Sequence, residues 1–173
     1  MFVVPSSWFL AEKEEFSLED KLLVSIAAAF HDTGFIRQYN KNETIGAEIA
    51  ERFIQATKYP YTQKHFETIK NAILATDITS NPQTKYEKVL RDADLSYFGS
   101  KDERKFLEQI KRLQKESQEY EESAIHQQSL DDNSFLNLNL KFISKHHWFT
   151  SSAKKLYSEN KQKNIIALKN YYE

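Results

Sequence analysis

The chain has 173 residues, no cysteine, three glycines, three prolines and a formal net charge of −1. Without cysteine, disulfides and thiolate metal sites are excluded. The even spread of basic residues excludes the electrostatic footprint of a nucleic-acid or membrane-surface binder. The length suits one domain over residues 1–173. The apolar start is short and lacks a basic leader, so we expect a cytoplasmic protein without signal peptide or membrane span.

Scarce glycine and proline favour long helices, so we predict an all-α fold. In the first half of the chain, helix-start signals fall at Ser6 or Ser7, Ser17, Asn42 and Thr62. The apolar spacing predicts three buried stripes: Leu22, Ile26 and Phe30; Ile45, Ile49 and Phe53; Phe66, Ile69 and Ile73. The last of these helices should end near Thr76 and Asp77.

The second half begins with a predicted helix from Thr84 to Tyr97, ended by Gly99. Asp102 opens a long polar helix with a buried stripe of Phe106, Ile110, Leu113 and Tyr120. Residues 136–142 alternate like a strand, but no second strand exists to pair with them, so we predict a helix. Thr150 should cap a final helix that carries Ala153, Leu156, Tyr157, Ile165 and Leu168.

The chain's most informative stretch is residues 27–35, AAAFHDTGF. It is typical of a buried helix that stops on two metal-type ligands, His31 and Asp32. Burying an imidazole and a carboxylate is costly unless something uses them. Gly34 is expected to supply a left-handed helix cap.

A third candidate ligand lies in the run Arg91-Asp92-Ala93-Asp94. At about 100° per residue, Asp92 and Asp94 point about 200° apart on a helix, so they cannot both face one site. Asp94 falls closer to the apolar face, which makes it the better candidate to look inward. Histidine nitrogen with carboxylate oxygens suits Zn, Mn or Fe.

These pieces resemble the HD-domain superfamily of metal-dependent phosphohydrolases, in its small stand-alone bacterial branch. The resemblance rests on residues 29–35 (AFHDTGF), Asn42-Glu43 with Ala47, residues 73–76 (ILAT), residues 90–96 (LRDADLS), and FISKH at 142–146 with Thr150. It implies a single helical bundle of the HD type around a metal. The family's ligand pattern implies that His31, Asp32 and Asp94 hold a divalent ion, with Mn, Zn, Fe, Co and Mg left open.

The family's first histidine has no counterpart before Val3 in this sequence. A truncated start, a misplaced start codon and a lost ligand are all left open. The tripeptide Ala75-Thr76-Asp77 stands where two-metal branches often have a histidine, and Phe35 replaces the lysine of some cyclic-dinucleotide branches. Both departures favour a single-metal site.

The resemblance implies hydrolysis of a phosphate ester by metal-activated water. We assign Asp32 and Glu43 as catalytic, Glu43 positioning the water or accepting its proton. The alternative for Glu43, to which we give equal weight, is a structural role: a carboxylate in the first turn of a helix is favoured by the helix dipole. Arg91 and Thr76 are candidate substrate contacts. The structural alternative for Arg91 is a surface or structural salt bridge with a neighbour such as Glu87, and that for Thr76 is a helix-end hydroxyl.

Two functions remain open on the sequence. The first is a metal-dependent phosphohydrolase, a phosphomonoesterase or phosphodiesterase, that acts on a nucleotide or related small phosphate ester. The second is a catalytically degenerate module of the same fold that binds a nucleotide or a protein partner. Neither requires nucleic acid or a membrane, and a homodimer is left open.

Overall fold

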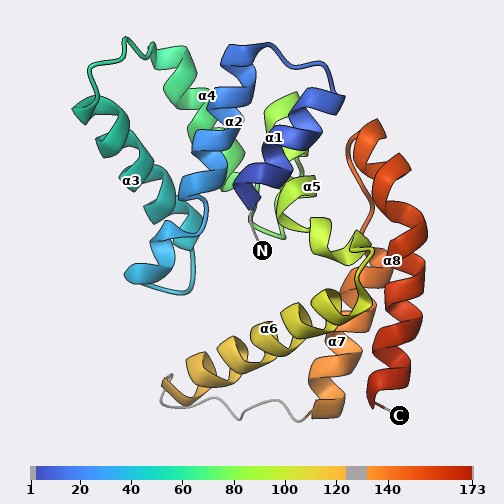
Figure 1. Ribbon diagram of the computed structural model, residues 1–173. Helices are drawn as coiled ribbons and strands as arrows, with labels where there is room; N and C mark the ends of the chain where they lie inside the picture. The colour runs from blue at the N-terminus through green and yellow to red at the C-terminus, as the bar shows by residue number, and fades with distance from the viewer. Residues whose placement is uncertain (1–2, 124–131, 173) are drawn as a thin grey trace. The chain divides into compact units, whose positions relative to one another are not determined.

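The computed structural model describes residues 3–123 and 132–172, and every regular element in them is a helix (Figure 1), which confirms the all-α prediction. Eight α-helices and two 3₁₀ helices follow one another in these residues: α1 (Val3–Lys13), α2 (Leu18–Phe30), η1 (Thr33–Ile36), α3 (Asn42–Ala56), α4 (Gln63–Leu74), α5 (Lys85–Asp94), η2 (Ser96–Gly99), α6 (Glu103–Ser123), α7 (Asp132–Lys145) and α8 (Ser151–Tyr172). No helix in this described part of the chain is both long and apolar enough to cross a bilayer.

The helices fall into two compact units. One, the α1–α5 unit, also includes residues Phe149–Ala153. The other, the α6–α8 unit, contains η2, α6, α7 and α8 from Lys154 onward. One domain over residues 1–173 remains a prediction.

Side-chain caps begin four helices where the sequence predicts them. The hydroxyls of Ser17, Thr62 and Thr84 accept hydrogen bonds from the backbone N–H three residues on, at 3.1, 3.2 and 3.3 Å. Thr150 does the same for the N–H of Ala153 at 3.2 Å. Such caps satisfy N–H groups that the first turn of a helix leaves without partners. They therefore fix where α2, α4, α5 and α8 begin.

Two predicted starts are wrong. Helix α1 begins at Val3, before Ser6 and Ser7, and the buried Ser7 hydroxyl donates instead to the carbonyl of Val4 within the helix. Asn42 is the first residue of α3, and the preceding Lys41 adopts a left-handed φ of 59° without a side-chain cap.

The buried faces of α2 and α3 lie one residue away from the predicted stripes. Helix α2 buries Leu23, Val24, Ala27 and Ala28, and helix α3 buries Asn42, Gly46, Ala47, Ala50 and Ile54. Leu22 is 45% exposed and Phe53 is 50% exposed. Close packing selects the small residues for the contact face, because they let the two backbones approach, and the bulky side chains flank it.

Gly34 and Gly46 permit this approach. A Cβ on Gly34 would lie 1.8 Å from the carbonyl oxygen of Asn42, and one on Gly46 would lie 2.6 Å from that of Phe30. No described glycine has a positive φ, so the predicted left-handed cap at Gly34 is wrong. Gly34 is needed for space: after α2 the chain continues into η1, which packs against the start of α3.

Asp92 ties helix α5 to the segment around Thr150. Its carboxylate is fully buried and accepts hydrogen bonds from the backbone N–H groups of Phe149 and Thr150, at 3.0 and 2.8 Å, and from the Thr150 hydroxyl at 2.7 Å. Glu14, after α1, accepts from the N–H of Ser152 at 2.7 Å. Two carboxylates of the α1–α5 unit therefore hold residues Phe149–Ala153.

The α6–α8 unit has its own core. Phe98, Phe106, Ile110, Ile143 and Leu168 are almost fully buried. The predicted helix over residues 136–142 is confirmed within α7. The side chains of Leu113, Leu156 and Tyr157 are only half-buried, and Tyr120 and His126 lie outside the side chains that the structure describes.

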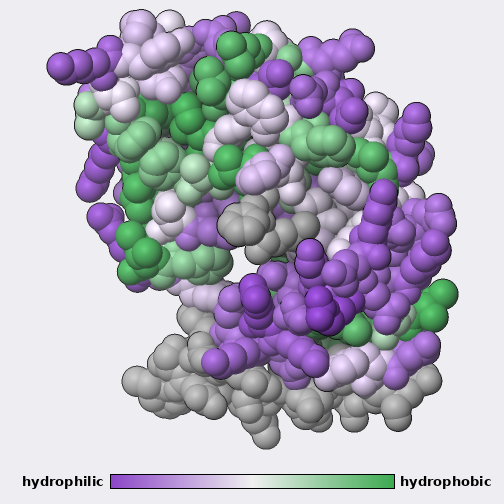
Figure 2. Space-filling view, viewed as in Figure 1, coloured by the Kyte–Doolittle hydropathy of each residue, from purple (hydrophilic) through white to green (hydrophobic). Residues whose placement is uncertain are grey.

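Apolar side chains also reach the surface. Figure 2 shows green, apolar surface on the left of the view, over η1 and α3, where the exposed residues include Phe35, Ile36 and Phe53. These side chains flank the small-residue contact of α2 with α3 rather than enter it.

Candidate functional site

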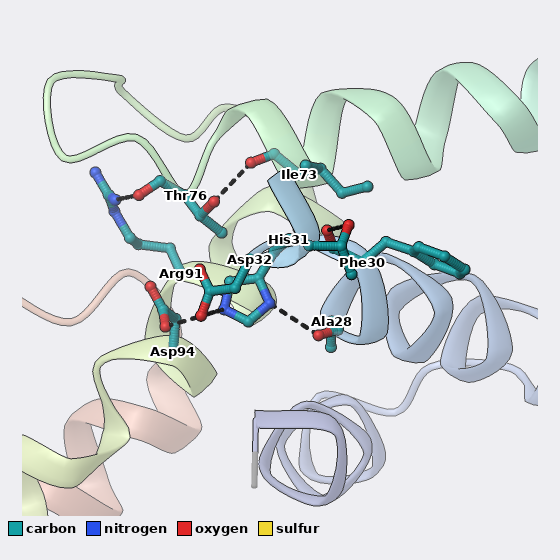
Figure 3. A network of polar contacts seen from close by, with 9 residues as sticks. Ala28, Phe30, His31, Asp32, Ile73, Thr76, Arg91 and Asp94 are labelled. Carbon is teal, nitrogen blue, oxygen red and sulfur yellow. Dashed lines mark hydrogen bonds and ion pairs between the residues drawn. The ribbon is translucent and has the colours of Figure 1, made fainter. Parts of the chain in front are cut away.

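His31 occupies the C-terminal end of α2 and is 5% exposed. Its Nδ1 lies 2.8 Å from the carbonyl oxygen of Ala28, one turn earlier in the same helix (Figure 3). A carbonyl oxygen only accepts, so Nδ1 must carry a proton. This contact fixes the ring and leaves Nε2 as the nitrogen that faces the rest of the site.

Two carboxylates approach that nitrogen. Nε2 of His31 lies 3.1 Å from Oδ2 of Asp32 and 3.4 Å from Oδ1 of Asp94. Asp32 follows directly after His31, whereas Asp94 comes from the last turn of α5. Figure 3 shows both carboxylates near the same edge of the ring. The structure thus brings together the three side chains that the sequence selected.

The pKa of His31 reflects this arrangement. Burial disfavours the imidazolium, but the negative charges of Asp32 and Asp94 outweigh burial and raise the pKa of His31 to about 10. Without another cation, the ring is therefore protonated at neutral pH and neutralises part of the carboxylate charge.

The donor set suits a divalent cation. Nε2 of His31 is buried and has no aligned hydrogen-bond partner in the part of the chain that the structure describes, although both carboxylates lie at ion-pair distance. Ligand atoms about 2.1 Å from one cation lie about 3.0–3.4 Å apart in octahedral or tetrahedral coordination, so the two measured separations are of the right size. No three His, Cys, Asp or Glu side chains within the described residues form a ready metal cage, however, so the carboxylates would have to reorient around an ion.

Glu43 and Asp77 extend the negative charge of the site. Glu43 lies in the first turn of α3 and is half-buried. Burial, with the carboxylates of Asp77 and Asp32 nearby, raises the pKa of Glu43. Asp77 was not among the predicted site residues. Its Oδ1 accepts hydrogen bonds from the N–H and the hydroxyl of Thr79. Asp77 follows α4 and lies near enough to Glu43 to raise its pKa, a proximity that tertiary packing sets and that has no sequence signal.

Arg91 contacts backbone carbonyls rather than Glu87, the neighbour that the sequence suggests for a surface or structural salt bridge. The guanidinium is buried and donates to the carbonyl oxygens of Thr76 and, at 2.6 Å, Asp77. Glu87 instead accepts from Gln83 and Thr84 at the start of α5. Arg91 points the other way because the carbonyls beyond the end of α4 lack helical partners and a buried fork of N–H groups can satisfy two of them.

Thr76 has the structural role of a helix-end hydroxyl, the alternative to a substrate contact. The hydroxyl is buried and donates to the carbonyl oxygen of Ile73 at 2.7 Å, within the last turn of α4. Together with the Arg91 contacts, this bond holds the end of α4 beside the site (Figure 3).

The two aspartates of α5 do point to different places, as the helical angle predicts. We expected Asp94 to be the more buried of the two. That expectation is wrong, because Asp92 is fully buried whereas the Asp94 side chain is 25% exposed. Asp92 faces Thr150, and Asp94 faces His31. The apolar stripe alone could not show that α5 has two buried neighbours.

The sequence around these residues matches a known protein family. The model described as HD domain matches residues 8–96, just over half of the chain, and the match includes His31, Asp32, Glu43, Asp77 and Asp94. No curated protein and no solved structure matches the chain significantly. The chain therefore belongs to the HD-domain superfamily of metal-dependent phosphohydrolases.

Proposed function

We propose that the chain hydrolyses a small phosphate ester, a nucleotide or a related compound, at a single divalent metal ion held by His31, Asp32 and Asp94. One observation carries the proposal: Nε2 of a buried, fixed imidazole faces two carboxylates from different parts of the chain. Mn, Zn, Fe, Co and Mg are all compatible with nitrogen and carboxylate ligands.

The bonds around His31 support a ligand role. The Ala28 carbonyl holds the Nδ1 proton, so Nε2 is the atom that can offer a lone pair once it is deprotonated. Metal-ligating histidines commonly have such a partner on the other nitrogen. Asp32 and Asp94 each have one oxygen near Nε2, and their other oxygens remain for further contacts.

The remaining groups suit hydrolysis. A divalent ion would lower the pKa of a water molecule and neutralise charge on phosphate oxygens. Glu43 has the raised pKa that brings a carboxylate closer to the range of a general base, and we assign it to accept the proton of the attacking water. Asp32 lies near enough to raise the pKa of Glu43.

For Arg91 and Thr76 we propose a structural role instead of direct contact with the substrate. Both use their polar groups on carbonyl oxygens at the end of α4. We assign them to hold Asp77 and the end of α4 in place, with the positive charge of Arg91 offsetting part of the surrounding carboxylate charge.

One observation favours the second function, a degenerate module that binds a nucleotide or a protein partner without hydrolysing it. His31 already pairs with both carboxylates, so the three groups balance part of their own charge without an ion. A protein of this kind would keep the fold and release no phosphate.

Phosphate release distinguishes the two functions. The metal-free chain is supplied in turn with Mn²⁺, Co²⁺, Mg²⁺, Zn²⁺ and Fe²⁺, and phosphate release is measured over a panel of nucleoside mono-, di- and triphosphates. For phosphodiesters, release of the nucleoside monophosphate is followed instead. The proposal predicts activity with at least one ion, lost in Asp94→Asn and kept in Asp102→Asn, whose carboxylate lies in the other unit. Metal binding without turnover on any substrate would favour the degenerate module.

A further inference from the structure

Lys161, in the middle of α8, is a buried cation without a carboxylate partner. The residue is 5% exposed, and no acidic group among the described side chains lies within ion-pair distance of its ammonium. Nζ donates one hydrogen bond, to the carbonyl oxygen of His146 just after α7. Burial lowers the pKa of Lys161, and no nearby carboxylate opposes that effect. An ammonium has three N–H donors, and the other two have no acceptor among the residues that the structure describes.

Lys161 lines a recess of about 380 Å³ within the α6–α8 unit. Its lining consists of His146, His147, Trp148, Lys154, Ser158, Lys161 and Gln162. Among the described side chains, the lining therefore contains two lysines and no carboxylate. Lys154 is exposed and forms no ion pair with the described residues. The two lysines give the described lining a net positive charge.

Trp148 adds a neutral donor. Its indole Nε1 is buried and has no hydrogen-bond partner among the described residues, although its ring packs against His146 and Tyr157. A buried N–H without an acceptor costs roughly 1–3 kcal/mol. Capping of α7 by Lys161 accounts for one bond, but it accounts for neither the second lysine nor the indole donor.

We infer that this recess binds a small oxyanion, either free phosphate or the phosphate group of a nucleotide, through Lys161, Trp148 and Lys154. An oxyanion offers several acceptors to the unused N–H groups and supplies the negative charge that the recess lacks. A cation or a carbohydrate would leave the two lysines uncompensated. The site is separate from the proposed metal centre, which lies in the α1–α5 unit, and it does not depend on the proposed function.

The test is a calorimetric titration of the metal-free chain with inorganic phosphate and, separately, with AMP. Metal-free Asp94→Asn is titrated in parallel as a control in which only the proposed metal centre is altered. We expect saturable binding in both proteins. Tighter binding of AMP than of phosphate would identify a nucleotide as the source of the anion, and equal binding would identify free phosphate.

Three substitutions locate the site. Lys161→Met keeps the apolar stem and removes the charge, and should weaken phosphate binding by about tenfold or more. Trp148→Phe removes the indole donor, and Lys154→Met removes the exposed charge; each should weaken binding by about threefold to tenfold. Lys155→Met, an exposed neighbour on α8 that does not line the recess, is the matched control and should bind as the parent does.

The inference is overturned if the parent shows no saturable phosphate binding, or if Lys161→Met folds and binds phosphate with unchanged affinity. Circular dichroism establishes whether each variant folds. Should Lys161→Met not fold, Trp148→Phe and Lys154→Met decide: weaker binding in both supports the site, and unchanged binding in both contradicts it.

Discussion

At the residue scale, one arginine connects two helices beside the site. Arg91 is 4% exposed and donates to two carbonyl oxygens after α4. Replacing it with methionine preserves bulk but leaves the buried carbonyl of Thr76 without a donor, whereas the carbonyl of Asp77 keeps its hydrogen bond from the N–H of Ser80 at 2.9 Å. We predict that Arg91→Met lowers the free energy of unfolding by about 2–3 kcal/mol, measured by urea denaturation.

The matched control is Arg52→Met, an exposed arginine of α3, which should change stability by less than about 0.5 kcal/mol. If Arg91→Met were as stable as Arg52→Met, the arginine would not hold the end of α4.

The outcome for individual residues shows what the sequence can and cannot predict. Local signals placed Ser17, Thr62, Thr84 and Thr150 correctly, because a cap depends only on the next three residues. The direction of Arg91 was missed because its acceptors lie 14 and 15 positions away in the chain. Asp77 was missed because the group that it influences, Glu43, is also distant in the sequence.

At the element scale, the contact of α2 with α3 depends on glycine. A Cβ at Gly46 would meet the backbone oxygen of Phe30 at 2.6 Å, and a backbone oxygen cannot move aside as a flexible side chain can. In an ordinary helix, Gly→Ala is stabilising by about 0.5–1 kcal/mol. We predict the opposite sign for Gly46→Ala, a loss of about 1–3 kcal/mol, measured by thermal unfolding.

Glu48→Ala, at an exposed position of the same helix, provides the comparison and should stay within about 0.5 kcal/mol of the parent. A stabilised Gly46→Ala would mean that the two helices can separate without cost.

The predicted faces of α2 and α3 were shifted for a related reason. The predicted stripes were built from the largest apolar side chains, and these include Leu22 and Phe53, which are about half exposed. Where helices pack closely, the small residues mark the contact. The Ala27-Ala28 and Gly46-Ala47 pairs were visible in the sequence, and they are the signal that would have given the right face.

A charged contact joins the first turns of α2 and α5. Asp20 accepts from Nζ of Lys85 at 2.6 Å and from the hydroxyl of Tyr86 at 2.5 Å. Burial opposes the charged form, but these bonds outweigh it and lower the pKa of Asp20 to about 2. A lowered carboxyl pKa stabilises the fold above the unfolded value near 4.

We therefore predict that Asp20→Asn costs about 1 kcal/mol at pH 7, a figure reduced because Lys85 is half exposed. The difference between the parent and Asp20→Asn should shrink as the pH falls from about 4 to about 2. Chemical denaturation at several pH values measures it. A difference that stays constant down to pH 2 would exclude a contribution from the Asp20 charge.

At the scale of the whole molecule, the candidate site draws its groups from four helices of the described part of the chain. The ends of α2, α4 and α5 and the start of α3 converge, so His31, Asp77, Asp94 and Glu43 meet although they are distant in sequence. The sequence identified three of these four residues through motif resemblance and helical geometry. The substrate remains undefined, because specificity depends on the shape of the space around these groups, which spacing does not encode.

The central claim is that His31, Asp32 and Asp94 bind one divalent ion, and direct metal binding tests it best. The metal-free protein is titrated with Mn²⁺ and, separately, with Zn²⁺, and the bound metal is counted after gel filtration. We predict one ion per chain, with affinity lowered by about 100-fold or more in His31→Ala and Asp94→Asn and unchanged in Asp102→Asn. No bound ion in the parent, or equal binding by Asp94→Asn and the parent, would contradict the claim.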